Sequence, residues 1–309
     1  MPGGNMRVLV AGAGGAIGRP IVRRLVSLGH EVSGIARGDE GAARISADGG
    51  TPFVADVLKP DEVEKAMAGA RPEVVIDQLT ALPRHYTPQA MRESLARTSE
   101  VRVVGGANVQ DAALAAGATR FLGQSGCYFY APGEGLAEES EPFVSSGPPL
   151  VAGNVEAFQQ VEDRITGLPQ GTTGLILRYG FYYGPGTWYS SDGDMGQQAR
   201  AGQLGVLGDG DGVWSFVHLE DAAEFTARVA VESQATGVVN VTDSDPLPMR
   251  DVMRAFSAFA GGVEPAEYPI TEETDADGVF YATKMRGASN RRAREEFGFS
   301  PRRLEWLRP

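Results

Sequence analysis

The sequence predicts an α/β fold, in which a doubly wound parallel sheet carries a smaller, interleaved C-terminal lobe. Six short apolar and β-branched runs alternate with helical patterns through the first 180 residues. Such alternation is typical of βαβ units and of a parallel sheet buried on both faces. After Gly180 the chain becomes rich in Gly, Asp and aromatic residues with little periodicity. We therefore predict a first domain over residues 1–180 and a smaller lobe over residues 181–309, interleaved with the first.

The predicted strands of the first domain follow one another at βαβ spacing, and right-handed crossovers then favour a doubly wound sheet. Their sequences are MRVLVAG (6–12), HEVSGIA (30–36), TPFVAD (51–56), EVVIDQ (73–78), TRFLGQS (119–125) and GLILRYG (174–180). The longest connecting helix is expected near residues 88–117, and another includes residues 155–165, whose apolar side chains are spaced for one buried face.

The second lobe begins with residues 180–216, which we predict to be loops around one short helix. Beyond them the pattern predicts a strand at VVNVT and three helices, over residues 219–232, 249–259 and 290–297, the last ending at Gly298.

Composition narrows the classes of partner. The 309 residues carry a net charge of −12, which disfavours nucleic acid and anionic membrane surfaces because both bind through Lys and Arg. No apolar stretch is long enough to span a membrane and no signal peptide is visible, so we expect a cytoplasmic protein. The single cysteine excludes an internal disulfide, and the three scattered histidines indicate no metal site.

A glycine-rich loop follows the first predicted strand and opens a helix. In RVLVAGAGGAIGRP, Gly12 permits the tight turn, Gly15 lets the backbone approach a pyrophosphate, and Gly18 lets helix pack on strand. The helix N-terminus, with Ala16 and Ile17, supplies N–H donors and a positive dipole. The strand–loop–helix context predicts a dinucleotide-binding Rossmann domain.

The end of the second strand discriminates between dinucleotides. NAD preference usually needs an acidic residue there, but this chain has Ala36 and then Arg37, whose guanidinium suits a 2′-phosphate. We therefore predict NADPH, with NADH as the alternative cofactor; a merely solvated Arg37 is the competing interpretation. Asp56, after the third strand, is placed to reach the adenine amino group or to cap the next helix.

Taken together, the motifs resemble the extended and atypical short-chain dehydrogenase/reductases, which include nucleotide-sugar epimerases and dehydratases. The resemblance covers nearly the whole chain and rests on GAGGAIG, VVIDQLTA, ATRFLGQSGCYFYAPGEG, LRYGFYYGPGT and WSFVHLEDAA. It implies that Val57, Leu79 and Thr80 also lie against the cofactor, with Thr80 near the nicotinamide ribose.

The family's catalytic residues are largely missing from this chain. The family uses a tyrosine acid, a lysine that lowers the pKa of that tyrosine, a serine or threonine, and an asparagine. The matching positions hold Leu150, Asn154, either Ser125 or Gly126, and a site near Arg102. Leucine cannot transfer a proton, so Ser125 is the remaining candidate for a catalytic group, as a donor to a substrate oxygen.

Three functions remain open. The first is an NADPH-dependent ketoreductase acting on a bulky aromatic polyketide of antibiotic biosynthesis, in which a hydroxyl of the substrate replaces the protein acid. The pattern of missing residues is similar to atypical ketoreductases that act on angucyclinone-type polyketides. The second is a nucleotide-sugar epimerase or dehydratase, and the third is a non-catalytic NADP-sensing regulator. We favour the first, with the chain a monomer or homodimer.

Aromatic residues gather in the segments that follow the fifth and sixth strands and in the second lobe. Ligands of α/β sheets bind outside the carboxyl ends of the strands, where these segments are expected. The residues predicted to contact the aromatic ketone are Tyr128, Phe181, Tyr182, Trp188 and Trp214.

Overall fold

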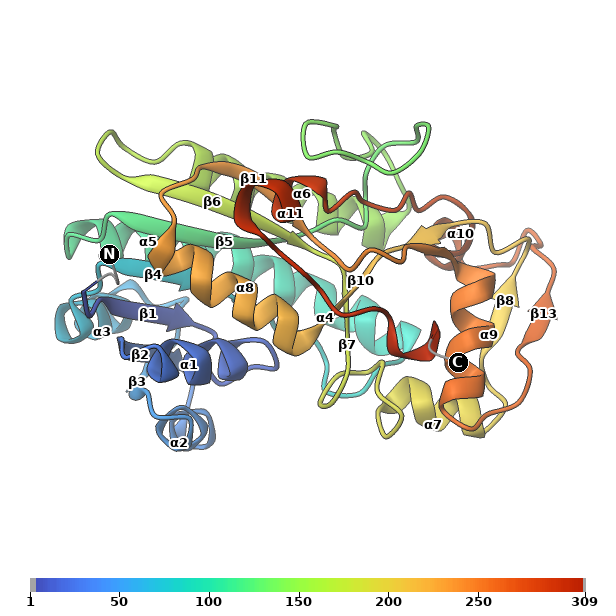
Figure 1. The fold of residues 1–309 in the computed structure, drawn as a ribbon, viewed down its shortest axis with the longest axis horizontal. Helices are drawn as coiled ribbons and strands as arrows, with labels where there is room; N and C mark the ends of the chain where they lie inside the picture. Colours follow the sequence, from blue (N-terminus) through green and yellow to red (C-terminus); the bar gives the residue numbers. More distant parts are fainter. Residues whose placement is uncertain (1–3, 308–309) are drawn as a thin grey trace.

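A seven-stranded parallel sheet forms the centre of the protein, for which a computed structural model describes residues 4–307. The strand order is β11-β6-β5-β4-β1-β2-β3, and every neighbouring pair is parallel (Figure 1). The six predicted strands and the one at VVNVT are confirmed. Their bounds are β1 (Arg7–Ala11), β2 (Glu31–Ala36), β3 (Thr51–Val54), β4 (Val74–Asp77), β5 (Arg120–Gly126), β6 (Thr173–Tyr179) and β11 (Gly237–Val241).

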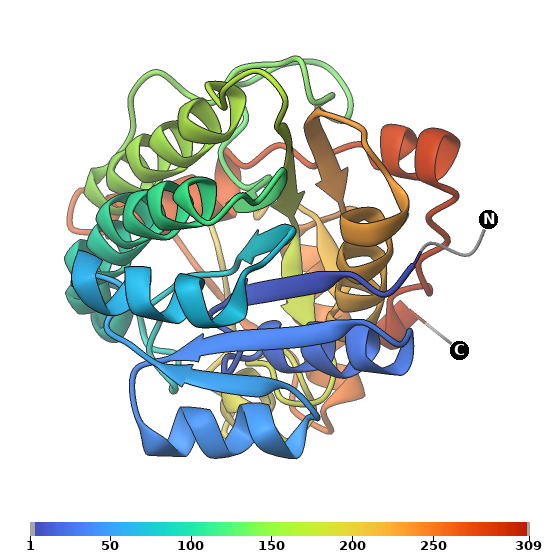
Figure 2. The same ribbon diagram turned by 90° about the vertical axis from the view of Figure 1, so that its left-hand side faces the viewer.

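Helices cover both faces of this sheet, as the near-continuous apolar strand sequences require (Figure 2). One layer contains α1 (Gly18–Ser27), α2 (Asp39–Ala47) and α8 (Leu219–Glu232). The other contains α3 (Pro60–Ala70), α4 (Pro88–Glu100), the π-helix η1 (Val101–Gly105), α5 (Gly106–Ala115) and α6 (Pro149–Thr166). The long helix predicted near residues 88–117 is thus one helical run interrupted by a π-turn.

Pro20 interrupts the hydrogen-bond ladder of α1 at one position in its first turn. Helix α1 begins at Gly18, so Pro20 is its third residue. The N–H groups of Arg19 and Ile21 donate to the carbonyl oxygens of Gly15 and Ile17, so Pro20 omits the one bond between them, to Ala16, at the end of the helix.

The second lobe lies at the carboxyl ends of the strands, on the right in Figure 1. The chain enters it after β6, returns to the sheet through α8 and β11, and then enters it again, so the two parts are interleaved. The elements of the lobe and its flanking segments are β7 (Phe181–Tyr183), α7 (Asp194–Arg200), β8 (Gly205–Leu207), β9 (Val213–Trp214), β10 (Phe216–His218), β12 (Leu247–Pro248), α9 (Met249–Phe259), β13 (Ala266–Tyr268), α10 (Ala276–Thr283), α11 (Arg291–Phe297) and η2 (Glu305–Leu307).

The predicted helices of this part are confirmed as α8, α9 and α11, with Gly298 at φ 62° closing the last. The prediction of loops around one short helix over residues 180–216 was incomplete, because four short strands also lie there. Strands of two or three residues are too short to show the alternation that marks a strand. Within the described residues, no helix has the length and apolarity that crossing a membrane would need.

Candidate active site

The glycine loop has the backbone geometry that the sequence predicts. Gly12 has φ 81°, and a Cβ there would lie 2.6 Å from the carbonyl oxygen of Gln78, on the segment that follows β4. A Cβ on Gly18 would collide with the carbonyl oxygen of Gly12. Both positions therefore require glycine, because no side chain fits between loop, helix and neighbouring strand.

The loop also leaves backbone donors free for an anion. Gly15 and Ala16 are exposed, and α1 has no side-chain cap at Ile17. Neither Ala16 nor Ile17 donates its N–H to any acceptor within residues 4–307. Free N–H groups at the positive end of a ten-residue helix fit a pyrophosphate, so this loop suits a dinucleotide.

Arg37 lies where it can meet the ribose end of such a cofactor. It is exposed and directly follows β2, whose end pairs with the end of β1 beside the glycine loop. It makes no hydrogen bond or ion pair in the described part of the chain. Its guanidinium is thus unoccupied, which fits a 2′-phosphate.

Asp56 and Val57 follow β3. The Asp56 carboxylate accepts a hydrogen bond from the N–H of Leu58 at 3.1 Å, and the cap position of α3 is Lys59, so Asp56 closes a turn and does not cap that helix. Val57 is buried, and its carbonyl accepts from Asn108 Nδ2 at 2.8 Å. Contact of either residue with adenine remains a prediction.

The segment after β4 connects the cofactor loop to the second lobe. Leu79 is buried and its N–H donates to Asp77 at 3.0 Å, while Thr80 is half-buried. Further along, His85 Nδ1 and the N–H of Tyr86 both bond the Asp194 carboxylate at the start of α7, at 3.0 and 2.8 Å. We call residues 81–87, together with their hydrogen bonds to Asp194, the latch.

Trp188 completes the latch from the second lobe. Its Nε1 donates to the carbonyl of Arg84 at 3.2 Å, and its ring packs against Tyr86 with centroids 5.2 Å apart. Trp188 therefore holds the latch in place and is only half-buried.

The positions of the family's catalytic residues hold groups that do not exchange protons at neutral pH. Leu150 is buried in the first turn of α6, and one turn later Asn154 donates to its carbonyl at 2.8 Å. Asn154 Oδ1 accepts from Arg102 at 3.2 Å. At Gly126, a Cβ would collide with the ring of Tyr128, so a serine does not fit there without movement of that ring.

Ser125 is committed to a buried network. Its hydroxyl donates to Glu162 at 2.6 Å, and Glu162 also receives two hydrogen bonds from Arg178, at 2.8 and 2.6 Å. Ser125 is 2% exposed. Its hydroxyl is therefore directed into the packing between β5 and α6, and this geometry argues against its predicted role as a donor to a substrate oxygen.

Four of the predicted aromatic residues, Tyr128, Phe181, Trp188 and Trp214, pack in one cluster with the second lobe, whereas Tyr182 packs against Tyr179. Tyr128 stacks on Phe181 with centroids 4.5 Å apart, and Phe181 lies 5.0 Å from Trp214. Tyr128, Phe181 and Tyr182 are half-buried, so parts of their rings face outward. Trp214 is buried and donates to the carbonyl of Tyr281 at 2.7 Å, which makes it a wall residue of the lobe.

Buried polar atoms without partners gather at the carboxyl ends of the central strands. Within residues 4–307 they include Gln78 Oε1 after β4 and Arg102 Nε on η1, while Gln124 on β5 and the Tyr182 hydroxyl on β7 lie close enough to act on one another. Burial raises the pKa of Tyr182 well above its ordinary value, so this phenol is neutral. Unsatisfied buried polar groups are costly, and those at these strand ends fit a site for a polar ligand such as the nicotinamide end of a cofactor.

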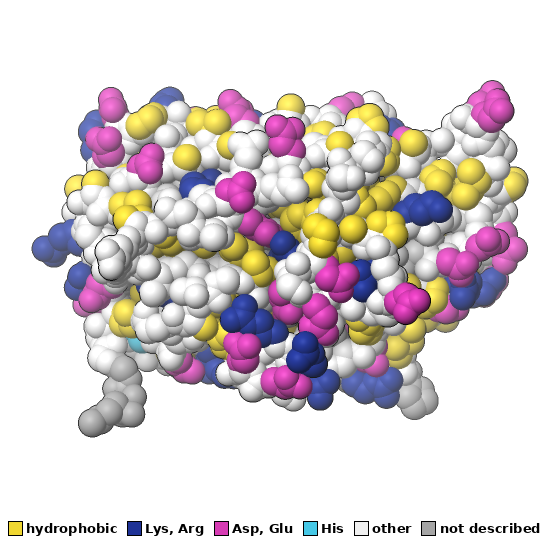
Figure 3. All heavy atoms as spheres, turned by 90° about the horizontal axis from the view of Figure 1, so that it is seen from above, with side chains coloured by type: hydrophobic (Ala, Val, Ile, Leu, Met, Phe, Trp, Pro, Cys, Tyr) yellow, Lys and Arg dark blue, Asp and Glu magenta, His cyan; other side chains and the backbone are white. Residues whose placement is uncertain are grey.

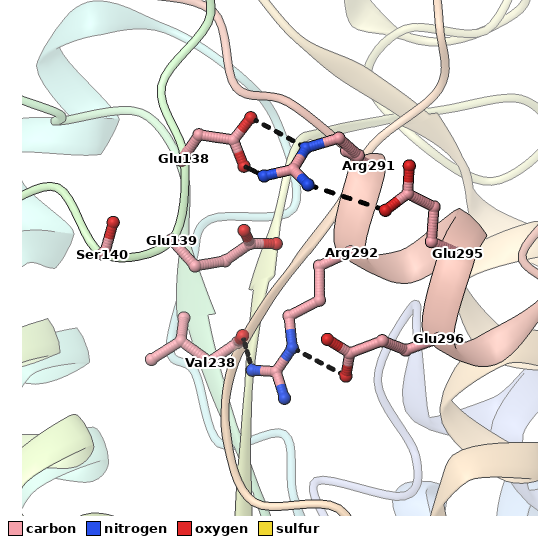
Figure 4. Close-up of a pocket in the computed structure, with 8 residues that line it drawn as sticks. All are labelled: Glu138, Glu139, Ser140, Val238, Arg291, Arg292, Glu295 and Glu296. Carbon is pink, nitrogen blue, oxygen red and sulfur yellow. Dashed lines mark hydrogen bonds and ion pairs between the residues drawn. The ribbon is translucent and has the colours of Figure 1, made fainter.

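Two surface pockets lie away from this site. One of about 520 Å³ is lined by charged residues around α11 and the segment before α6, including Glu138, Glu139, Arg291 and Arg292 (Figure 4). Arg291 pairs with Glu138 at 3.0 Å, and Arg292 with Glu296 at 3.0 Å, so its charges compensate one another. Acidic and basic side chains are likewise interspersed over the face seen in Figure 3.

Comparison with known proteins decides the family. Residues 8–242 match the model of the NAD dependent epimerase/dehydratase family. The chain belongs to this family. It is an NAD(P)-dependent oxidoreductase of the extended short-chain type, as its sequence motifs predict. Its family membership accounts for the strand–loop–helix cofactor site described above.

Curated relatives of this epimerase/dehydratase family member include reductases. The chain is 39% identical over 308 residues to a 3-diazoavenalumate denitrifying reductase of Streptomyces sp, covering 97% of this chain and 98% of the relative. It is 25% identical to a 2'-dehydrokanamycin reductase of Streptomyces kanamyceticus, over 86% of this chain and 70% of that protein.

Solved epimerase structures share the fold. A UDP-glucose 4-epimerase of Thermus thermophilus in complex with NAD superposes with a TM-score of 0.73 at 24% identity, covering 97% of this chain and 96% of the other. The likeness extends to both parts of the chain.

Sequence reasoning missed two features of the site. The latch was not foreseen, because its bonds join positions about 100 residues apart. The contact between Arg102 and Asn154 was not foreseen either, although both positions were singled out by the family pattern, and their pairing could have been sought there.

Proposed function

We propose that this chain is an NADPH-dependent reductase of a bulky aromatic natural product, and that its acceptor group needs no proton from the protein. The observation that carries the proposal is the set of residues at the four catalytic positions. Gly126, Leu150 and Asn154 have no group that can donate a proton as the family's tyrosine does, and Arg102 stays charged at neutral pH. Hydride transfer itself needs the cofactor and the acceptor to be held in the right orientation, and this requirement does not depend on a proton donor at the four positions.

The residues present fit the cofactor. The free N–H groups of Ala16 and Ile17 suit its pyrophosphate, and the unoccupied Arg37 suits a 2′-phosphate, which is why we place NADPH before NADH. When bound, the reduced nicotinamide supplies the hydride. Asp56, Val57, Leu79 and Thr80 belong to the segments that follow β3 and β4, at the same edge of the sheet as the glycine loop.

One acceptor that fits is a ketone with a neighbouring hydroxyl, as in a peri-hydroxylated aromatic polyketide. The intramolecular hydrogen bond polarises the carbonyl and stabilises the alkoxide that forms, so the substrate replaces the missing tyrosine. The half-buried rings of Tyr128, Phe181 and Tyr182 supply the apolar surface that a flat polycyclic ligand needs.

A second acceptor is favoured by the 39% identical relative, whose name describes the denitrifying reduction of a diazo compound. A hydride added to the terminal nitrogen of an aryl diazo group forms an N–H bond and gives an aryl diazene. The diazene then loses N₂, and its hydrogen ends on the ring carbon. This sequence balances without any protein acid, and so it accounts for Leu150 and Asn154 with the fewest assumptions.

The other two candidates are weaker. An epimerase or dehydratase must oxidise a sugar hydroxyl and needs a base for its proton, which the four positions lack. A regulator that only senses NADP has no need for a lobe with an aromatic cluster beside the cofactor site.

The proposal is tested with purified protein, NADPH and three acceptors: 8-hydroxy-1-tetralone, 8-methoxy-1-tetralone and a 2-hydroxybenzenediazonium salt. We expect protein-dependent NADPH oxidation with the hydroxylated ketone or with the diazonium salt, the latter releasing N₂. The methoxy ketone should react about 10²–10³ times more slowly than its partner, as when one oxyanion donor is lost. The control is the same mixture without protein, because diazonium salts can accept hydride in solution.

The outcomes separate the candidates. N₂ release with no ketone reduction supports the diazo acceptor, and the reverse pattern supports the ketone. Equal rates with the two ketones would contradict substrate assistance. No oxidation with any aromatic acceptor, in protein shown to bind NADPH, would contradict a reductase of this class and favour the regulator.

A further inference from the structure

Arg102 occupies a position between the sheet and α6 at the predicted active site. It lies on the π-helix η1, and its NH1 donates to Asn154 at 3.2 Å. Its guanidinium carbon stands 4.6 Å from the centre of the Phe158 ring. π-turns are often found at functional sites, and this one places the guanidinium beside the two positions where the family has its tyrosine and lysine.

Arg102 has fewer hydrogen-bond partners than the other three buried arginines of the described residues. Arg178 pairs with Glu162, and Arg286 pairs with Glu141. Arg120 donates to the carbonyl oxygens of Ala235 and Val229. Within residues 4–307 the Arg102 side chain makes one hydrogen bond, to a neutral amide, and its buried Nε, like that of Arg120, has no partner.

The Asp77 carboxylate attracts Arg102, but it makes no hydrogen bond to that guanidinium, and both of its oxygens accept from other donors. One accepts from Arg164 at 3.0 Å and the other from the N–H of Leu79 at 3.0 Å. The remaining groups that act on Arg102 are the phenols of Tyr128, Tyr182 and Tyr281, all of which burial keeps neutral by raising their pKa.

Arg102 nevertheless remains charged at neutral pH. Burial lowers the pKa of Arg102 to about 10, still well above neutrality. At 7% exposure, a guanidinium with one neutral partner is an unfavourable arrangement for a folded protein. Such arrangements persist where the charge has a use that the unliganded protein does not show.

We propose that Arg102 recognises a negatively charged oxygen of the aromatic substrate, a phenolate or a carboxylate. The inference rests on the proposed function and specifies its substrate class as an anionic arene. The guanidinium supplies charge-assisted hydrogen bonds to an oxygen anion, including one from the Nε that has no partner in the protein. Arg102 thereby orients the acceptor and offsets the cost of its own burial.

The direct test measures binding and not turnover. The NADP⁺-loaded protein is titrated with anthraquinone-2-carboxylate and its methyl ester, and with 2-hydroxyanthraquinone and 2-methoxyanthraquinone, following quenching of tryptophan fluorescence. We expect the wild type to prefer one anionic member over its neutral partner. Arg102→Met should weaken that anion roughly 10- to 100-fold and leave its neutral partner unchanged, and Arg102→Lys should lie between.

The two pairs of probes distinguish a carboxylate from a phenolate as the charged group of the ligand. A preference confined to the acid and ester identifies a carboxylate site, and one confined to the phenol and ether identifies a phenolate site. No anion preference, or an equal loss for charged and neutral probes in Arg102→Met, would overturn the proposal. A failed turnover assay with intact anion preference would instead count against the proposed reaction.

A second measurement is independent of the shape of any probe. Removing an uncompensated buried charge should stabilise the free protein, so Arg102→Met should raise its melting temperature by about 2 °C. The matched control is Arg164→Met, which should lower the melting temperature because it leaves the buried Asp77 carboxylate unpaired. A fall in melting temperature for Arg102→Met like that of Arg164→Met would show a structural role and contradict the proposal.

Discussion

Arg37 is the residue on which the choice of cofactor depends. Because Arg37 makes no hydrogen bond or ion pair with residues 4–307, replacing it by alanine removes no such contact there, and we expect the fold to stay intact. Arg37→Ala should weaken NADPH binding by about 1.5–3 kcal/mol, the value of a hydrogen bond to a charged group, and should leave NADH binding nearly unchanged. Equilibrium titration with both cofactors measures this, with Arg97→Ala on α4 as the control. Equal losses for NADPH and NADH would remove the basis for an NADP preference.

Ser125 is the residue for which sequence and geometry disagree. Its hydroxyl bonds Glu162 in the packed interior, so Ser125→Ala should lower the free energy of unfolding by about 1.5–3 kcal/mol and change the rate of hydride transfer little. Thermal unfolding and single-turnover NADPH oxidation of the same sample measure the two effects. A large loss of rate in a variant of unchanged stability would show that Ser125 acts in catalysis and would contradict this prediction.

The latch is the element that couples the two parts of the molecule. The Asp194 carboxylate forms hydrogen bonds with His85 Nδ1 and with the N–H of Tyr86. Asp194→Ala should therefore release residues 81–87 from α7. We expect a raised KM for the aromatic acceptor and an unchanged Kd for NADPH, since the cofactor loop lies on other elements. His85→Ala is the milder comparison, because that side chain is 86% exposed and the bond from Tyr86 stays. Unaltered acceptor kinetics in folded Asp194→Ala would show that the latch is only structural.

Secondary structure was predictable where an element carries its own periodic signal. The six strands of the first domain are continuous apolar runs, and α8 and α9 have the predicted bounds. The short strands β7, β8, β9, β10, β12 and β13 were not predictable, because two or three residues pair only through tertiary contacts. The direction of the Ser125 hydroxyl was also hidden, since it depends on a glutamate 37 positions away, on another element. The missing partner of Arg102 is likewise a property of the packed molecule and not of the sequence.

At the scale of the whole molecule, Asp243 gives stability a pH dependence. It lies just beyond β11 and is 2% exposed. Burial raises the pKa of Asp243 to about 7, and repulsion from Asp245 and Asp221 adds to this. A folded pKa above the unfolded value of about 3.9 means that the native state holds the proton more tightly. The contribution of Asp243 to stability is therefore full below about pH 4 and is lost as the pH rises to about 7.

Asp243→Asn should remove that dependence, because asparagine can still accept the hydrogen bond from the N–H of Asp245. The measurement is the difference in melting temperature between variant and wild type as a function of pH. The melting temperature of the variant should rise relative to that of the wild type as the pH increases from acid to neutral. A constant difference would show that Asp243 titrates alike in the folded and unfolded states.

The whole account depends on hydride transfer that proceeds without a proton from the protein. The most direct measurement is the single-turnover rate of NADPH oxidation with the reactive acceptor, followed across the neutral and mildly alkaline range in the wild type and in the Leu150→Tyr/Asn154→Lys double variant. NADPH deuterated at the transferred position identifies the hydride step. We predict that the rate of this step does not change with pH and that restoring tyrosine and lysine produces no large gain. A wild-type rate that falls with the titration of one group, or a large gain in the double variant, would show that a protein acid limits the reaction and would contradict the account.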